Sequence, residues 1–235
     1  MIIMAFDTTA KSASVSVTDG TRALAVYSID NGLTQSELLL PMAEDILRSL
    51  KLSFSDVELF AASVGPGSFT GVRIGVALVK GLAFGKNVPC VEVSTLEALA
   101  ENMRGISGII VPVMDARRSQ VYGAVFESDG TEMKQILDDG AYPLSELADV
   151  LKEFAGMPIY LVGDGYQIAK SALLNLGVET ESTPDLLILE NARSVAAVAL
   201  KKYESGEYTT DLEIAPTYLR MPQAERERLE REKIK

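Results

Sequence analysis

The sequence predicts an α/β protein built from two lobes of related design. Apolar runs alternate with amphipathic segments, so that the first hundred residues are predicted to form strand, hairpin, helix, strand, helix, strand and helix. A similar order begins again after residue 105. With 235 residues, 47% of them hydrophobic, the chain can form one large domain or two small lobes. We predict a first lobe over residues 1–104, a second over 105–220 and a charged helical tail over 221–235.

Three strands are expected at the start of the first lobe. Residues 1–6 form a continuous apolar run that ends at a polar turn, as a buried strand does. Small polar and apolar residues then alternate over 12–18 and over 23–29, with Asp19-Gly20 between them. An Asp-Gly pair between alternating runs is typical of a tight hairpin, so a three-strand meander is predicted.

A helix is expected next, over residues 34–50, because apolar residues recur on one of its faces. Thr34 and Glu37 fit a capping box at its start. Pro41 predicts a kink or a broken first turn. The remaining elements expected in this lobe are a strand at 59–64, a helix at 70–85, a strand at 88–93, and a helix capped by Ser94 and Glu97 that ends near 103.

The second lobe begins with another apolar run, residues 108–114, which ends at Asp115 as the first run ends at Asp7. An alternating run then reaches a second Asp-Gly turn at Asp129-Gly130. A helix, a strand, a glycine turn and two further helices are expected at 145–154, 159–162, 163–165, 167–176 and 191–203, and residues 213–220 are expected to be extended. The shared order favours an internal duplication, and coincidence of common hairpin chemistry is the alternative.

The segment from Val64 to Gly75 is a glycine-dense turn between an apolar strand and a helix. Its spacing is one residue off the dinucleotide fingerprint, and Val72-Arg73 stand where a P-loop requires Lys and then Ser or Thr. One interpretation is that Gly71 and Gly75 allow close packing of the helix on the sheet or on another helix. The other is that Ser68, Phe69 and Thr70, at the helix entrance, contact a partner, because an exposed Phe is costly unless covered.

An aspartate ends the first strand of each lobe, and two alternatives explain this pattern. If the lobes face each other across a cleft, Asp7 and Asp115 converge there, and paired acids hold magnesium and phosphates. Otherwise each acid only caps the turn after its strand. The hydroxyls of Thr8 and Thr9 could donate to a ligand, although glycines are missing from this turn. Together these predict a possible nucleotide cleft, to which the glycine turn after the fourth strand of the second lobe adds Gly163 and Gly165.

The chain has no histidine and one cysteine, Cys90. The first fact excludes Ser-His-Asp triads, Cys-His dyads and zinc sites that need histidine. A lone thiol closes no internal disulfide, so we expect a cytoplasmic, metal-free protein.

The net charge of -11 argues against a stand-alone nucleic-acid binder, because phosphate contacts need clustered Lys and Arg. Neither a signal peptide nor an apolar run of membrane-spanning length is recognised, so no contact with a membrane is expected.

Several motifs occur together and in order over residues 1–220. They are Asp7-Thr8-Thr9, Leu39-Leu40-Pro41-Met42, the run from Val64 to Gly75, Val93-Ser94-Thr95-Leu96, Met114-Asp115-Ala116-Arg117 and Pro216-Thr217-Tyr218-Leu219-Arg220. With these motifs the chain resembles the TsaB (YeaZ) family, and the Gly-Pro-Gly-Ser-Phe-Thr-Gly run is the most specific of them. The resemblance implies a duplicated actin-like (ASKHA) fold, in which each lobe has a mixed sheet, a three-strand meander at its start and flanking helices.

The resemblance also implies a function. Members of that family are non-catalytic paralogues of TsaD, which carries the metal site on histidines of its own. With TsaD and the ATPase TsaE they are required to place threonylcarbamoyl on the adenosine beside the anticodon of ANN-decoding tRNAs. We therefore expect a scaffold or activator subunit that has no catalytic residues and contacts tRNA only through the complex. No cofactor is expected to be required, although ATP or ADP could bind weakly or at the complex interface.

The family's dimer surface is formed by two helices of the first lobe, which would be residues 34–50 and 70–84 here. The same surface is expected to serve a homodimer and a heterodimer with TsaD, which then compete. The implied contact residues are Gln35, Leu38, Leu39, Met42, Gly67, Ser68, Phe69, Thr70, Arg73 and Ile74. Family members often carry His-Ser where this chain has Gln35-Ser36, which leaves the contact at position 35 open.

Two enzymatic alternatives are weaker. An ATP-dependent small-molecule kinase on the same duplicated fold would use Asp7, Asp115 and the turn Gly163-Asp164-Gly165, but the phosphate-loop glycines are missing. A metallopeptidase lacks a base or ligand set without histidine.

Overall fold

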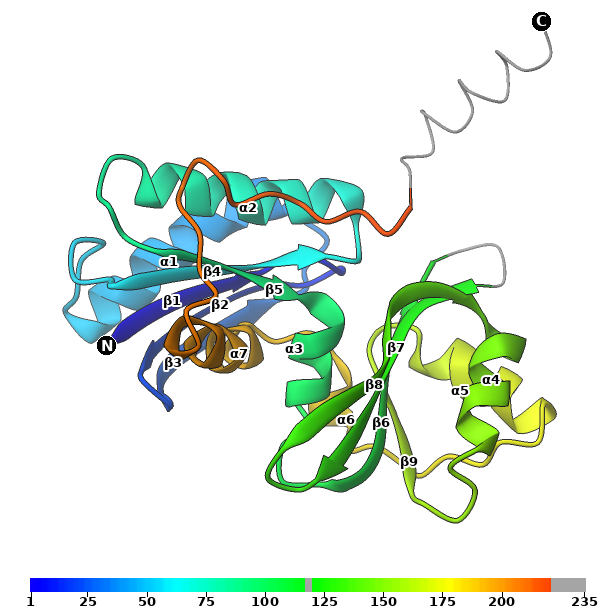
Figure 1. The fold of residues 1–235 in the computed structure, drawn as a ribbon. Coiled ribbons are helices and arrows are strands. Elements are labelled where there is room, and N and C mark those ends of the chain that lie inside the picture. The colour runs from blue at the N-terminus through cyan, green and yellow to red at the C-terminus, as the bar shows by residue number, and fades with distance from the viewer. Residues whose placement is uncertain (117–119, 221–235) are drawn as a thin grey trace, which may run out of the picture.

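The computed structural model of the protein describes residues 1–116 and 120–220, which form two lobes, each built on one β-sheet (Figure 1). The charged tail predicted for residues 221–235 lies outside the described residues. None of the described helices is both long enough and apolar enough to span a membrane.

The first sheet has the strand order β3-β2-β1-β4-β5. Strand β1 pairs antiparallel with β2 and parallel with β4, so the predicted meander is extended by crossover strands. The strands are β1 Ile2–Asp7, β2 Ala13–Asp19, β3 Arg22–Ile29, β4 Leu59–Gly65 and β5 Cys90–Ser94.

The second sheet has the order β8-β7-β6-β9 and repeats the first. Strand β6 pairs antiparallel with β7 and parallel with β9, as β1 does with β2 and β4. A helix also follows the meander, and another follows the parallel strand, in both lobes. The predicted duplication is therefore confirmed. The strands are β6 Ser107–Asp115, β7 Gln120–Asp129, β8 Met133–Pro143 and β9 Ile159–Val162.

Helices cover both faces of the first sheet. Because side chains alternate along a strand, Met4 and Phe6 of β1 face the helices α1 (Gln35–Leu50) and α2 (Phe69–Ala83). Ile3 and Ala5 face the other side, where α7 (Ala192–Glu204) packs. Strand β1 is buried on both faces for this reason, as its continuous apolar sequence predicts.

The second sheet is covered in the same way. Helices α4 (Leu144–Lys152) and α5 (Tyr166–Asn175) pack on its outer face. On its inner face lies α3 (Thr95–Glu101), whose apolar side chains form one core with those of β6, β7 and β9. Helix α3 also contacts α7 on the first lobe, so it lies between the two sheets (Figure 1).

Two predictions about helix starts need correction. Thr34 is the N-cap of α1, but its side chain makes no capping bond to the backbone, and its hydroxyl instead donates to the carboxylate of Glu37 at 2.8 Å. Pro41 does not break the first turn, since α1 is continuous from Gln35 to Leu50. Ser94 does cap α3, accepting from the backbone N–H groups of Leu96 and Glu97.

The end of the described chain returns to the first lobe. Helix α7 and residue Ile214 pack on the first sheet, although the sequence-based division assigned 105–220 to the second lobe. The crossing follows a short helix that the sequence patterns did not reveal, α6 (Asp185–Ile188). Residues 213–220, expected to be extended, form no strand.

Candidate functional site

The glycine-dense turn after β4 packs directly on the turn that follows β1. The backbone N–H of Ser68 donates to the carbonyl of Thr9 at 2.6 Å, and the hydroxyl of Thr8 donates to the carbonyl of Gly71 at 2.7 Å. The hydroxyl of Ser68 caps α2 by accepting from the N–H of Gly71 at 3.2 Å. The two turns therefore form one packed unit at the start of α2.

Three glycines make this approach possible. A Cβ at Gly67 would lie 2.4 Å from the carbonyl oxygen of Thr9, and one at Gly71 would lie 1.9 Å from that of Thr8. At Gly75 it would lie 2.7 Å from the hydroxyl oxygen of Thr8. Close packing at Gly71 and Gly75 is therefore observed, but the neighbour is the turn that follows β1 and not the sheet or another helix.

Phe69, predicted to contact a partner, is covered by the chain itself. Its ring stacks on that of Tyr218, with centroids 4.7 Å apart, and the guanidinium carbon of Arg73 lies 3.8 Å from the Phe69 centroid. The Nε of Arg73 donates to the hydroxyl of Tyr218 at 2.8 Å. Phe69 remains half-buried, so part of it still reaches the surface.

The outer side of α2 carries an exposed stripe without acidic side chains. Its residues follow helical spacing and are Thr70, Arg73, Ala77, Gly81 and the C-cap residue Phe84. Phe84 is 72% exposed, and a Cβ at Gly81 would meet nothing within 4 Å. Small residues in mid-helix allow another helix to approach closely, which makes this stripe a candidate protein contact. Ile74 is half-buried at its edge.

Helix α1 contributes less to the surface than predicted. Leu39 and Met42 are 2% and 4% exposed and belong to the core under the first sheet, so their assignment to a partner surface is wrong. Leu38 is half-buried against the same core. The amide of Gln35 donates to the carbonyl of Ala10 at 2.8 Å, which ties the start of α1 to the β1–β2 turn.

Asp7 is buried and fully engaged by its neighbours. Its carboxylate accepts from the hydroxyl of Ser63 at 2.5 Å and from the N–H and hydroxyl of Thr9 at 3.0 and 2.8 Å. Burial raises the pKa of Asp7, and these hydrogen bonds oppose the rise. The turn-capping interpretation therefore describes Asp7.

A buried acid that sequence reasoning missed lies near Asp7. Glu190, 6% exposed at the crossing between the lobes, has a pKa raised to about 8, first by burial and then by the charges of Asp7 and Asp164. Its Oε1 has no hydrogen-bond partner in the described part of the chain. The burial depends on the meeting of two lobes, so no local pattern could have revealed it.

The second-lobe residues of the predicted nucleotide cleft donate their backbone N–H groups to other residues of the chain. The N–H of Gly163 donates to the carbonyl of Ile188 at 2.6 Å and that of Gly165 to the carbonyl of Val113 at 3.0 Å. Asp115 is exposed, and its own N–H donates to the carboxylate of Asp164 at 3.1 Å. In residues 1–116 and 120–220, no three His, Cys, Asp or Glu side chains are grouped as a metal site would need.

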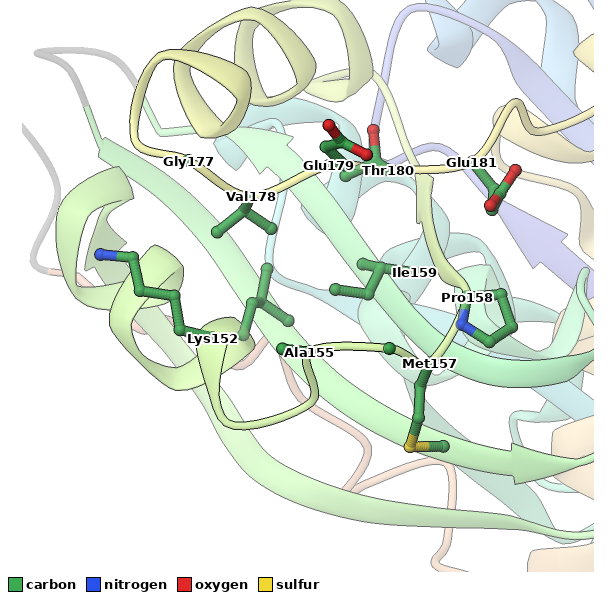
Figure 2. Close-up of a pocket in the computed structure, with 12 residues that line it drawn as sticks. Lys152, Ala155, Met157, Pro158, Ile159, Gly177, Val178, Glu179, Thr180 and Glu181 are labelled. Atoms are coloured by element: carbon green, nitrogen blue, oxygen red, sulfur yellow. The ribbon is translucent and has the colours of Figure 1, made fainter.

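A separate cavity of about 810 Å³ lies on the second lobe (Figure 2). It is bounded by the end of α4, the start of β9 and the segment from Gly177 to Glu181. Lys152, Glu179 and Glu181 stand at its edges, and Ile159 and Val178 line its floor. None of the predicted site residues lines this cavity.

Comparison with known proteins gives a consistent result. Residues 34–228 match the family described as TsaD, tRNA N6-adenosine threonylcarbamoyltransferase. A protein from Bacillus subtilis (strain 168), named tRNA threonylcarbamoyladenosine biosynthesis protein TsaB, is 29% identical over 233 residues, which cover 99% of this chain and 100% of that protein. The protein of the same name from Escherichia coli (strain K12) is 29% identical over 235 residues, 94% and 95% of the two chains.

Two solved structures are similar to this chain over most of its length. The structure of YeaZ from Pseudomonas aeruginosa has a TM-score of 0.75 and 25% identity, covering 93% of this chain and 99% of that one. A second structure from that organism, of an uncharacterized protein with similarity to peptidase YeaZ, gives 0.76 and 26%, with the same coverage. The actin-like duplicated fold that the motifs imply is the fold observed here. The chain therefore belongs to the family described as TsaD, tRNA N6-adenosine threonylcarbamoyltransferase, and within it resembles the TsaB (YeaZ) proteins over nearly its whole length.

Proposed function

We propose that this chain acts in tRNA threonylcarbamoyladenosine biosynthesis as a non-catalytic subunit that binds a TsaD paralogue and activates it. The names of its relatives and the family match over residues 34–228 support the pathway. The absence of histidine supports a division of labour in which the paralogue carries the catalytic centre and the ATPase TsaE is the third member. In this proposal the chain contacts tRNA only through the complex. The complex acts in the cytoplasm.

One observation carries the non-catalytic part of the proposal. Three backbone N–H groups of the predicted nucleotide cleft, those of Thr9, Gly163 and Gly165, are already donated to the chain's own oxygens. Both carboxylate oxygens of Asp7 also accept hydrogen bonds already, from Ser63 and Thr9. A phosphate would have to displace these bonds, and each buried group left unpaired costs about 1–3 kcal/mol. The kinase alternative loses support for the same reason.

The contact with the paralogue is assigned to the exposed stripe of α2. Its residues carry no acid, although the chain has a net charge of -11, and the small residues Ala77 and Gly81 allow a partner helix to approach. Phe84, 72% exposed, is the apolar anchor at one end of the stripe. A second copy would use the same stripe, so homodimer and heterodimer compete.

The contact is tested by mixing this chain with a TsaD paralogue and measuring the complex mass by light scattering after size exclusion. Ala77→Arg and Gly81→Arg place a long cation on the exposed stripe, where the fold has room for it. We expect both to abolish the heterodimer and the homodimer. Leu174→Arg, on the 62% exposed Leu174 of α5, is the matched control and should leave both unchanged. Intact complexes with both stripe variants would put the contact elsewhere.

The activating role is tested by reconstitution. TsaD and TsaE are incubated with tRNA and substrates, with and without this chain, and the modified nucleoside is quantified. Equal rates in the two reactions would disprove the role. Calorimetry of the isolated chain with ATP and with ADP tests the cofactor: we expect weak binding or none, whereas micromolar affinity with turnover would revive the kinase.

A further inference from the structure

The last described residues, 214–220, cross the first lobe as an irregular strap. Ile214 is fully buried, and the N–H of Ala215 donates to the carboxylate of Glu92 on β5 at 2.7 Å. The N–H of Thr217 donates to the carbonyl of Val64 at the end of β4, at 2.8 Å. The strap is therefore fixed to the first sheet by its backbone, and in Figure 1 it is the orange to red segment that runs along α2.

Tyr218 anchors the strap to the start of α2. Its ring stacks on Phe69, and its hydroxyl accepts from Arg73 at 2.8 Å. Aromatic stacking, a cation–π contact and a charge-assisted hydrogen bond act on this one side chain. Three separate interactions therefore hold the Tyr218 side chain on α2.

Two residues later the strap reaches the other lobe. Nη1 of Arg220 donates to the carbonyl of Ala116, directly after β6, at 2.9 Å, and Nη2 donates to the amide oxygen of Gln120, the first residue of β7. The guanidinium carbon lies 5.5 Å from the ring centroid of Tyr122. One side chain thus makes three contacts with the second lobe, a use of the guanidinium fork that lysine could not replace.

The position of the Arg220 anchor determines how strongly it resists rotation of one lobe against the other. The chain enters the second lobe from α3 at the start of β6, at Ser107. Strand β6 has nine residues, so its far end, beside Ala116, lies roughly 30 Å away at strand spacing. A contact at that distance from the α3 connection resists rotation of one lobe against the other more effectively than a contact beside it.

We propose that residues 214–220 are an inter-lobe tether, anchored on the first lobe by its own backbone and by Tyr218 and on the second lobe by Arg220, which limits rotation of the lobes about α3. The tether acts within one chain and does not depend on the proposed function. The two ends of the tether differ: the second-lobe end depends on the side chain of Arg220, whereas the first-lobe end keeps the backbone bonds of Ala215 and Thr217 when the Tyr218 ring is lost. Loss of the Arg220 side chain should therefore free the lobes more than loss of the Tyr218 ring.

The test measures the inter-lobe distance by double electron–electron resonance in the full chain. Spin labels are attached to cysteines at the exposed positions Glu44 on α1 and Gln167 on α5, while the native Cys90 stays buried and unlabelled. We expect Arg220→Ala to broaden the distance distribution, and Tyr218→Ala to broaden it less, because the backbone bonds of Ala215 and Thr217 remain. The double variant should match Arg220→Ala, because a tether that is already cut at one end transmits no force from the other. Arg48→Ala, which removes an exposed arginine paired with Asp45, is the control and should leave the distribution unchanged.

The outcomes separate the tether from local contacts. A distribution for Arg220→Ala that is indistinguishable from that of Arg48→Ala would overturn the proposal, and so would a double variant with a broader distribution than Arg220→Ala alone. Far-ultraviolet circular dichroism checks the fold of each variant. Gln120→Ala removes one of the three second-lobe contacts of Arg220, so it should broaden the distribution less than Arg220→Ala, and it tests the anchor independently if Arg220→Ala fails to fold.

Discussion

Gly71 has no room for a side chain, because a Cβ there would lie 1.9 Å from the backbone oxygen of Thr8. We predict that Gly71→Ala lowers the free energy of unfolding by about 2–4 kcal/mol, since backbone on both sides must shift. Gly81→Ala in the same helix is the matched control. Its Cβ meets nothing within 4 Å, so better helix propensity should raise the free energy of unfolding by roughly 0.5–1 kcal/mol. Urea denaturation of both variants measures the difference, and equal effects would contradict the packing.

Glu190 makes stability depend on pH. Its pKa is raised from 4.5 to about 8 in the folded chain, so between these values the folded state binds a proton that the unfolded state has lost. The free energy of unfolding therefore falls as pH rises between these two pKa values, by up to about 1.4 kcal/mol per pH unit. Above the pKa of the folded state it falls no further on account of Glu190. Below the ordinary pKa of a glutamate the penalty is absent.

We predict that Glu190→Gln removes this penalty, because glutamine keeps the shape and stays neutral. At pH 5 the variant and the parent should be similarly stable, and at pH 7.5 the variant should be more stable by about 2–4 kcal/mol. Urea denaturation at several pH values measures this. Glu204→Gln, on an exposed residue at the end of α7, is the control. A stability difference that stays constant with pH would show that Glu190 does not titrate in this way.

For single residues, the sequence predicted that a close contact is made but not which residue makes it. The spacing of Gly71 and Gly75 indicates close packing, whereas Thr8, the residue they pack on, stands about sixty positions earlier and belongs to another turn. Phe69 was recognised as needing a cover, but its cover, Tyr218, comes from the other end of the chain. Local patterns contain no information on such pairs.

At the scale of helices and strands, the sequence predicted most of the elements, but it did not predict that α1 would stay continuous through Pro41. Pro41 removes a backbone hydrogen bond in α1, at a cost of about 3 kcal/mol. The helix stays continuous because its buried face, including Leu39, Ile46 and Leu47, packs on the first sheet, and tertiary packing supplies most helical stability. The short α6 was missed because four residues are too few to give a periodic pattern.

Asn102, the C-cap residue of α3, holds the crossing between the lobes. Its amide nitrogen donates to the carbonyls of Leu187 and Leu189 at 3.0 and 2.8 Å, and its amide oxygen accepts from the hydroxyl of Ser194 on α7 at 2.5 Å. One side chain therefore joins α3, the crossing segment and α7.

We predict that Asn102→Ala lowers the free energy of unfolding by about 2–4 kcal/mol, because three polar groups lose their partner together. Asn102→Asp keeps the shape and the acceptor but loses both donors, so it should also destabilise. Asn175→Ala, at the exposed end of α5, is the control and should change stability by less than about 0.5 kcal/mol. Urea denaturation measures all three. An Asn102→Ala variant as stable as the control would mean that water replaces these bonds without loss.

For the whole molecule, the repeat was predictable because it recurs in linear order, and the two sheets confirm it. The return of α7 to the first sheet was not predictable. Its amphipathic pattern indicates that one face of the helix is buried, but it does not indicate which lobe that face packs on. This return means that the first lobe contains chain from outside its own stretch. Helix α3, packed on both lobes, adds a shared apolar core.

These connections predict that the two lobes unfold as one cooperative unit, and the single thiol reports it. Cys90 is fully buried on β5, and burial raises its pKa to about 11, so the folded protein should react very slowly with a disulfide reagent. In the second lobe, Val125→Cys in a Cys90→Ala background places a matched thiol at another fully buried position. We expect both thiols to become reactive at the urea concentration at which circular dichroism is lost, since α3 contributes apolar side chains to a core cluster of each lobe. Exposure of one thiol at a clearly lower concentration than the other would instead show that the lobes unfold separately, and that α3 stays with the more stable one.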